Sequence, residues 1–220
     1  MIKVENIEVH GWEAAIRGMR NPMNSWAKSD SDFDFKAPDG TPCIGGSDLD
    51  LMNRLYKAGT EHRKYLRMIT VTMDITAPLY WWKEFDTYKV GTVANSCSTM
   101  HKIHAKEFEM DDFSCEHLFD EWGNSTLYKY CMRTVIAHLN TARDKNLGTK
   151  DKRYWWQMIQ LLPSSYNQRR TVQMSYENAM AMIKQRENHK LDEWVEFVGV
   201  LKDLPYVREI TGKEKKDVLL

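Results

Sequence analysis

The sequence lacks an excess of charge of either sign. Its 220 residues carry 31 Lys and Arg side chains against 31 Asp and Glu side chains, so the formal net charge is zero at pH 7. A protein that follows a nucleic-acid backbone usually shows a basic surface, because neutralising phosphates supplies much of its affinity. The balance of charge argues against a nucleic-acid polymer as partner and leaves a single nucleotide open.

Cysteine pairs and long apolar runs are also lacking. The four widely spaced cysteines form no C-x-x-C motif, which predicts reduced thiols and neither a disulfide framework nor a zinc ribbon. No uncharged run approaches the roughly 20 residues that cross a bilayer, and the first residues contain no apolar segment typical of a signal peptide. We therefore expect a cytoplasmic protein with no membrane partner.

Three motifs of common catalytic folds are absent as well. The sequence contains no G-x-G-x-x-G, no G-x-x-x-x-G-K-[ST] and no G-x-S-x-G, so a Rossmann enzyme, a P-loop NTPase or an α/β-hydrolase is unsupported. His101 and His104 would share one face of a helix, but only His62 and scattered carboxylates could complete a metal site. We predict no metal.

Apolar periodicity predicts more helix than strand. The clearest strand is expected at residues 66–75, where apolar side chains alternate with polar ones. Further extended segments are expected at residues 2–9 and 166–173, and a long loop at 28–46. Helices are expected at residues 12–19, 47–57, 125–145 and 152–162, and also after Pro78, after Ser175 and around Trp194. This pattern predicts an α/β or α+β fold with a small sheet, in a single domain over residues 1–208 with a charged tail over 209–220.

Two features indicate which side chains enter the core. The tryptophan pairs at residues 81–82 and 155–156 are expected in the core or a subunit interface, with a stacking platform for a flavin or base as the alternative. The helix at 125–145 is expected to bury one stripe of side chains. The stripe consists of Tyr128, Cys131, Val135, Ile136 and Leu139.

Two adjacent arginines form the strongest candidate for an anion site. Arg169 and Arg170 follow Gln168 and precede a helix that Ser175 is expected to cap. Guanidinium groups bind phosphate through paired hydrogen bonds, and the start of a helix adds partial positive charge. Arg186, several turns later, is a further candidate for this site. The alternative is a pair of solvated surface side chains.

A short polar segment at residues 91–101 is the second candidate. Small hydroxyl and amide side chains allow a ligand to approach closely, whereas the alternative is an ordinary polar turn. Cys97 lies in this segment without an adjacent His or Lys, so we predict a buried, unreactive thiol. The small polar side chains are Thr92, Asn95, Ser96, Ser98 and Thr99.

Two segments of the chain resemble the flavin-dependent thymidylate synthases, the ThyX family. Residues 68–102 contain a strand, Ala77-Pro78 and an amphipathic helix, which in the family precede the signature R-H-R-x7-S-x-R. Residues 161–197 contain Leu-Pro, an extended segment, a helix with Arg186 and the sequence Trp-Val-Glu, in the family's order. The resemblance covers most of the chain. It implies a ThyX-like fold with a small, mostly antiparallel sheet and several long helices, and a homotetramer with ligand sites at subunit interfaces.

The signature itself departs from the family. Its arginine-histidine-arginine triplet falls on residues 87–89, where Lys89 is the only cation, and its serine falls near Cys97 or Ser98. The family's flavin-holding Asn-Ala-Arg segment falls near Ser175. Each lost arginine removes charge-assisted hydrogen bonds of about 1.5–3 kcal/mol. We therefore expect a flavin and a nucleotide arranged as in the family to bind poorly.

The resemblance implies three alternative functions. The first is a ThyX-like nucleotide-binding protein that has left thymidylate synthesis and binds or sequesters a small nucleotide, as a phage-encoded protein would in the host cytoplasm. The second is a thymidylate synthase with a variant motif, which methylates dUMP with FAD, NADPH and methylene-tetrahydrofolate. The third is a structural, oligomeric interaction module.

The candidate residues fall into two sets, and no catalytic residue is assigned. Those assigned to the nucleotide are Arg169, Arg170, Arg186, Ser98 and Asn95. Those assigned to FAD are Tyr88, Lys89, Thr92 and Ser175.

Overall fold

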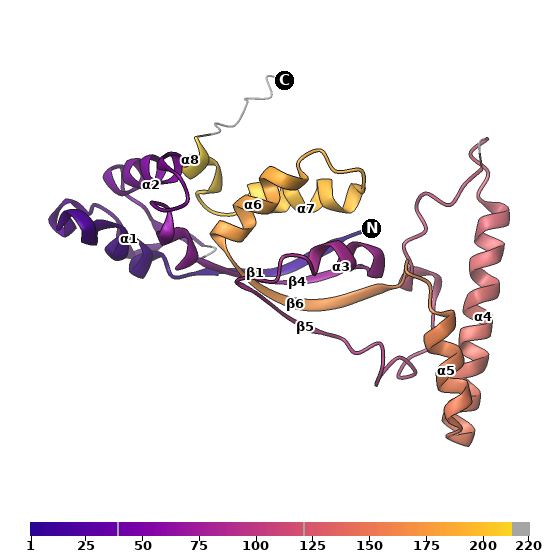
Figure 1. Ribbon diagram of the computed structural model, residues 1–220. Coiled ribbons are helices and arrows are strands. Elements are labelled where there is room, and N and C mark those ends of the chain that lie inside the picture. Colours follow the sequence, from indigo (N-terminus) through magenta and orange to yellow (C-terminus); the bar gives the residue numbers. More distant parts are fainter. Residues whose placement is uncertain (39, 121, 213–220) are drawn as a thin grey trace. The chain divides into compact units, whose positions relative to one another are not determined.

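A computed structural model describes the whole chain except residues 39, 121 and 213–220 (Figure 1). The chain divides into two compact units, each built from several segments. Unit 1 comprises Met1–Lys3, Ile75–Thr87 and Asn95–Thr171, and unit 2 comprises Val4–Asp74, Tyr88–Ala94 and Val172–Leu220. A single domain over residues 1–208 stays a prediction. Within the described part of the chain, no helix is long and apolar enough to cross a membrane.

A four-stranded sheet has the strand order β1-β4-β6-β5. Strand β4 buries every second side chain from Val71 to Ala77, as its alternating sequence predicts for a strand with one buried face. The fold is a mixture of helices and antiparallel sheet, which confirms the predicted fold class. The strands are β1 (Lys3–His10), β4 (Thr70–Pro78), β5 (Thr92–Ser96) and β6 (Asn167–Ser175).

Two parts of the secondary structure differ from the sequence-based expectation. Residues 28–46 are not one long loop, because β2 (Asp32–Lys36) and β3 (Pro42–Cys43) pair there in antiparallel fashion. The polar segment at 91–101 contains strand β5, whose side chains are all exposed or half-buried. A strand at the edge of a sheet with no buried face carries no apolar alternation, so periodicity could not reveal it.

Unit 1 contains a helical hairpin of α4 (Thr126–Thr149) and α5 (Lys152–Leu161), which pack against each other (Figure 1). Leu139 lies in the core as predicted, but Tyr128 and Cys131 are exposed. The buried stripe begins at Met132 instead. Cys131 lies about 100° around the helix from Met132, and Tyr128 lies about one turn before the stripe begins. The buried members of this core are Ile103, Phe108, Phe113, Met132, Leu139, Ala142 and Met158.

Within unit 1, helix α3 (Leu79–Phe85) contacts the start of strand β6. Trp81 and Trp82 are 0% and 1% exposed, which confirms the expectation that they pack in the core. The indole Nε1 of Trp82 donates a hydrogen bond of 2.9 Å to the carbonyl oxygen of Gln168. This contact fixes the strand next to the two candidate arginines.

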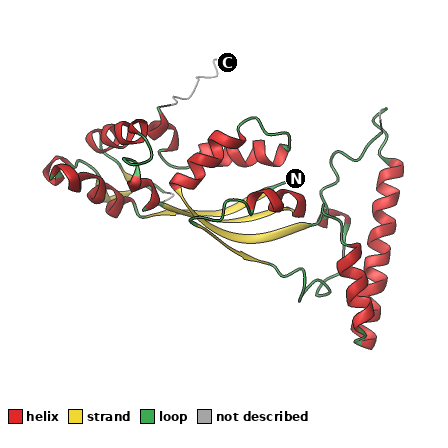
Figure 2. Ribbon diagram, in the orientation of Figure 1, coloured by secondary structure: helices red, strands yellow, loops and turns green. Residues whose placement is uncertain are grey.

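Unit 2 is mostly helical. Helices α6 and α7 lie side by side (Figure 2), and α2 packs on α8. Ser175 caps α6 as predicted, because its hydroxyl accepts a hydrogen bond from the Asn178 N–H at 3.3 Å. Of the predicted tail, residues 209–211 belong to α8, and 213–220 lie outside the described residues. The helices are α1 (Trp12–Arg20), α2 (Gly46–Ala58), α6 (Tyr176–Arg186), α7 (Asp192–Lys202) and α8 (Val207–Thr211). Short 3-10 turns lie at Asn21–Met23, Trp26–Lys28 and Lys64–Arg67 in unit 2 and at Met110–Asp112 in unit 1.

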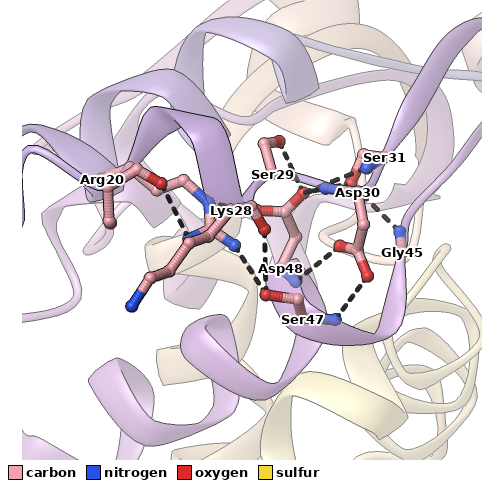
Figure 3. A network of polar contacts seen from close by, with 9 residues as sticks. Arg20, Lys28, Ser29, Asp30, Ser31, Gly45, Ser47 and Asp48 are labelled. Carbon is pink, nitrogen blue, oxygen red and sulfur yellow. Dashed lines mark hydrogen bonds and ion pairs between the residues drawn. The ribbon is translucent and has the colours of Figure 1, made fainter.

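A buried polar network joins α1 to the start of α2 (Figure 3). Arg20 donates from Nε to Asp48 Oδ1 at 2.6 Å, and both side chains are almost fully buried. Ser29 and Ser31 donate to the other carboxylate oxygen at 2.8 and 2.7 Å. Asp30 accepts from the backbone N–H of Asp48 at 3.0 Å, which satisfies a donor of the first turn of α2. The loop at 25–31 is thereby held on the helix.

Candidate functional site

A surface hollow of about 600 Å³ in unit 1 brings together two of the predicted nucleotide residues, Ser98 and Arg169. Its volume falls within the range of about 300–1,000 Å³ that is typical of small-molecule sites. The lining comes from five parts of the unit: the first residues, strand β4, the segment after β5, the 3-10 turn at Met110–Asp112 and the start of β6. The lining residues are Met1, Ile2, Lys3, Thr76, Cys97, Ser98, Thr99, Lys102, Ile103, Lys106, Asp111, Asp112, Tyr166, Asn167, Gln168 and Arg169.

Hydrogen bonds fix the segment after β5 against β6. The N–H of Cys97 donates to the carbonyl oxygen of Arg169 at 2.9 Å, and the side-chain amide of Gln168 donates to the carbonyl oxygen of Cys97 at 2.7 Å. The Ser98 hydroxyl accepts from the N–H of His101 at 2.9 Å. A hydroxyl that accepts one hydrogen bond still carries its own hydrogen. Ser98 is therefore held in place and keeps a donor for a ligand.

Cationic side chains outnumber carboxylates in the hollow. Lys106 forms an ion pair with Asp112, and this hydrogen bond raises the pKa of Lys106. Lys102 is exposed and has no ion pair or side-chain hydrogen bond with any residue that the structure describes. The remaining positive charge of the lining comes from Lys3, Lys102 and the exposed Arg169. Sequence reasoning missed both lysines after the polar segment, because the turn that brings them to the hollow has no periodic pattern.

Tyr166 gives the hollow an aromatic wall. Its ring meets Phe108 and Phe113 edge-on, with centroids 6.3 and 5.7 Å apart. Burial raises the pKa of the Tyr166 phenol, and the nearby Asp112 carboxylate raises it further. The side chain therefore stays neutral at pH 7 and offers an apolar ring next to the cations.

Cys97 is exposed and lines the hollow, so the prediction of a buried thiol is wrong. It directly follows β5, which lies at the edge of the sheet with no further strand beyond it. An edge position leaves side chains uncovered. The thiol is accessible to reagents in solution.

Arg170 does not line the hollow. Successive side chains of a strand point to opposite faces, and Arg170 is directed towards helix α3. Its guanidinium pairs with Asp86 at 2.7 Å and stacks on the ring of Trp82 at 4.1 Å, while its Nε donates to Gln168 Oε1 at 2.9 Å. Because only 14% of its side chain is exposed, the alternative of a solvated surface side chain is wrong for Arg170.

Arg186 lies in unit 2, where it contacts a residue predicted to bind flavin. Its Nε donates to the hydroxyl of Tyr88 at 3.0 Å, and its guanidinium lies 4.8 Å from the ring centroid of Trp194. The Tyr88 hydroxyl donates in turn to Gln185 Oε1 at 2.9 Å. Arg186 and Tyr88 are thus tied to each other, and Lys89 beside them is exposed. The predicted site residues are therefore divided between the two units.

Three further candidates have structural positions of their own. Thr92 accepts at 3.2 Å from the side-chain amide of Asn178, which also donates to the carbonyl oxygen of Val90 at 2.7 Å. Asn178 lies in the first turn of α6, where its backbone N–H donates to Ser175, the helix cap. Asn95 is exposed on β5 and does not line the hollow. Their roles in binding stay predictions.

The histidine pair lies at the end of the polar segment and in the turn after it. His101 is exposed, and the Nδ1 of His104 is buried and has no hydrogen-bond partner among the residues that the structure describes. Across the described residues, no three His, Cys, Asp or Glu side chains are placed to hold a metal ion.

Comparison with known proteins supports the fold. The sequence matches no model of a known family, and no curated protein matches it. Two solved structures of the flavin-dependent thymidylate synthase ThyX from Helicobacter pylori, with FAD and dUMP, are similar to this chain. The first has a TM-score of 0.67 and 16% identity and covers 96% of this chain and 97% of the other. The second has a TM-score of 0.66 and 16% identity over 95% and 97%. The chain has a ThyX-like fold.

Proposed function

We propose that this chain is a nucleotide-binding protein that has lost thymidylate synthesis, and that the hollow of unit 1 holds the phosphate of a small nucleotide. The observation that carries the proposal is that Ser98, Lys102 and Arg169 line one hollow of about 600 Å³. Ammonium and guanidinium groups bind phosphate through charge-assisted hydrogen bonds of about 1.5–3 kcal/mol each. The similar fold of a ThyX that was crystallised with dUMP supports a nucleotide as the ligand.

The loss of synthesis is supported by the degenerate signature. Of the three residues at the triplet position, Lys89 is the only cation. Tyr88, the middle residue, is bound to Gln185 and Arg186. A flavin would have to replace these contacts. The proposed role is to bind or sequester the nucleotide, as suits a phage-encoded protein.

Titration calorimetry with nucleoside monophosphates tests the phosphate contacts. Lys102→Glu and Arg169→Glu should each weaken binding about tenfold or more, because a repelling charge replaces a charge-assisted bond. Lys83→Glu is the matched control, since Lys83 is an exposed lysine of α3 in the same unit that does not line the hollow. If both charge reversals bound as tightly as the control, the hollow would not be the phosphate site.

Alkylation of cysteine locates the ligand independently. Because Cys97 lines the hollow, a bound nucleotide should slow its reaction with iodoacetamide. Cys43 and Cys131 are also exposed and lie outside the hollow, so their rates should not change. Equal protection of all three thiols, or none of Cys97, would count against this location.

A second candidate function is a flavin-dependent thymidylate synthase with a variant motif. The observation that favours it is the similarity in fold to structures crystallised with both FAD and dUMP. In this alternative, Tyr88 and Lys89 take over contacts to the flavin. Growth of a thymidine-requiring host that expresses the chain would support this function. Absence of growth in a host that contains the folded protein would count against it.

A homotetramer with ligand sites at subunit interfaces is also proposed. Helix α4 exposes large apolar side chains on the surface opposite its buried stripe, and Leu127 and Tyr130 are each 67% exposed. Such exposed apolar surface often marks an interface. Light scattering should show a tetramer that Leu127→Glu with Tyr130→Glu dissociates. A tetramer without any nucleotide ligand would favour the interaction module instead.

A further inference from the structure

Two adjacent carboxylates in the hollow differ in their surroundings. Asp112 pairs with Lys106, and its second oxygen accepts from the N–H of Glu109 at 3.0 Å. Asp111 is exposed and lines the hollow, yet it has no ion pair or side-chain hydrogen bond with any residue that the structure describes. Asp112 therefore holds the fold locally, whereas Asp111 has no such contact in the described part of the chain.

The hollow also contains an unpaired cation. Lys102 and Asp111 line the same hollow but form no ion pair, so their charged groups lie more than the 4.0 Å limit of an ion pair apart. A ligand that satisfies both needs an anionic group for Lys102 and hydrogen-bond donors for Asp111. An ionised carboxylate is an acceptor only, with two oxygens available.

We propose that Asp111 accepts hydrogen bonds from the 2′,3′-diol of a ribose, so that the hollow selects ribonucleotides over 2′-deoxyribonucleotides. This inference rests on the proposed function of the hollow. A vicinal diol presents two adjacent O–H donors to the two oxygens of a carboxylate, and a carboxylate reads the ribose hydroxyl in the same way in dinucleotide-binding folds. Most base edges alternate donors with acceptors and match a carboxylate less well. The edge of guanine, with two adjacent N–H donors, is the exception that the experiment must separate.

The test compares UMP with dUMP and GMP with dGMP by titration calorimetry on the full chain. UMP and GMP should each bind about tenfold or more tightly than their deoxy counterparts, because one charge-assisted hydrogen bond is lost with the 2′-hydroxyl. Asp111→Asn should reduce this ratio towards one, because the ribonucleotides lose both hydroxyl contacts to a carboxylate whereas the deoxynucleotides lose only that of the 3′-hydroxyl. Asp112→Asn is the matched control: it releases Lys106 and should tighten all four ligands without changing the ratio.

The outcomes separate the two proposals. Equal binding of ribo- and deoxyribonucleotides, or a ratio unchanged in Asp111→Asn, overturns the ribose contact and leaves the nucleotide site standing. Tight binding of GMP and dGMP alone, lost in Asp111→Asn, assigns Asp111 to guanine and also overturns the ribose contact. Failure of all four ligands to bind the folded protein overturns the nucleotide site as well. Thermal unfolding of each variant shows whether it is folded.

Discussion

The alternation of a strand gives Arg169 and Arg170 different environments although they are neighbours in sequence. Arg169 is exposed at the hollow, whereas Arg170 is enclosed by Trp82, Asp86 and Gln168. Their adjacency in the sequence predicts one anion site that contains both. The structure places Arg169 at the hollow, where we propose that it contacts a phosphate, and it packs Arg170 against Trp82.

Replacing Arg170 should therefore affect stability more than binding. Arg170→Ala removes the cation stacked on Trp82 and leaves Gln168 Oε1 without this donor, so the free energy of unfolding should fall by about 1–3 kcal/mol. Arg169→Ala should lower it by less, because the Arg169 side chain is exposed whereas most of the Arg170 side chain is buried. Urea unfolding of both variants measures this difference. A more stable Arg170→Ala than Arg169→Ala would contradict the assignment.

The buried carboxylate of Asp48 makes stability depend on pH. Burial alone raises its pKa, but hydrogen bonds from Ser31, Ser29 and Arg20 outweigh burial and lower the pKa below its ordinary value. The carboxylate therefore stabilises the fold fully above the unfolded pKa of about 3.9, and this contribution is lost as the pH falls through the lower, folded pKa.

Asp48→Asn should cost about 3–5 kcal/mol at pH 7, because it leaves Arg20 buried without its counter-charge. The difference from the unsubstituted chain should shrink below about pH 4, where Asp48 of the unfolded chain becomes protonated, until the pH falls through the lower pKa of the folded chain. Asp50→Asn is the control on the same helix, since its pair with Arg54 is exposed and contributes about 0.3–0.5 kcal/mol. Denaturant unfolding across this pH range measures both, and a constant difference would contradict the role of Asp48.

At the scale of elements, the start of α2 depends on close contact between the helix and the loop before it. A Cβ at Gly45 would lie 2.3 Å from the backbone oxygen and side chain of Asp30, while a Cβ at Gly46 meets nothing within 4 Å. Gly45→Ala should therefore lower the free energy of unfolding by more than about 1 kcal/mol. Gly46→Ala should raise it by about 0.4–1 kcal/mol through reduced freedom of the unfolded chain. Thermal unfolding of the two variants measures this difference. Equal effects would show that Asp30 moves to make room for the new Cβ at position 45.

The sequence predicts the helices and strands that bury at least one face, because burial imposes a pattern of apolar residues. It does not reveal a strand with no buried face. Strand β4 alternates because one of its faces is buried, and the cap of α6 was visible in Ser175. Strand β5 was not predicted, because an exposed edge strand needs no apolar side chains. The hollow was only half predicted: Ser98 and Arg169 carried a chemical signal, but Asp111 acquires its place from tertiary packing.

At the scale of the whole molecule, a net charge of zero conceals a local excess of positive charge. The lysines and the arginine of the hollow are balanced by carboxylates elsewhere in the chain. Zero net charge still disfavours a polymer as ligand, whereas a local cluster suits a single phosphate. The ThyX-like fold supplies the scaffold, and the residues in the hollow decide what it binds.

The central claim is that this chain binds a nucleotide without flavin chemistry. The most direct measurement is the absorption spectrum of the freshly purified protein, followed by denaturing extraction and identification of the released small molecules. We predict a colourless protein that releases a nucleotide, or that gains thermal stability when one is added. Stoichiometric release of FAD from a yellow protein would contradict the claim and favour the variant thymidylate synthase.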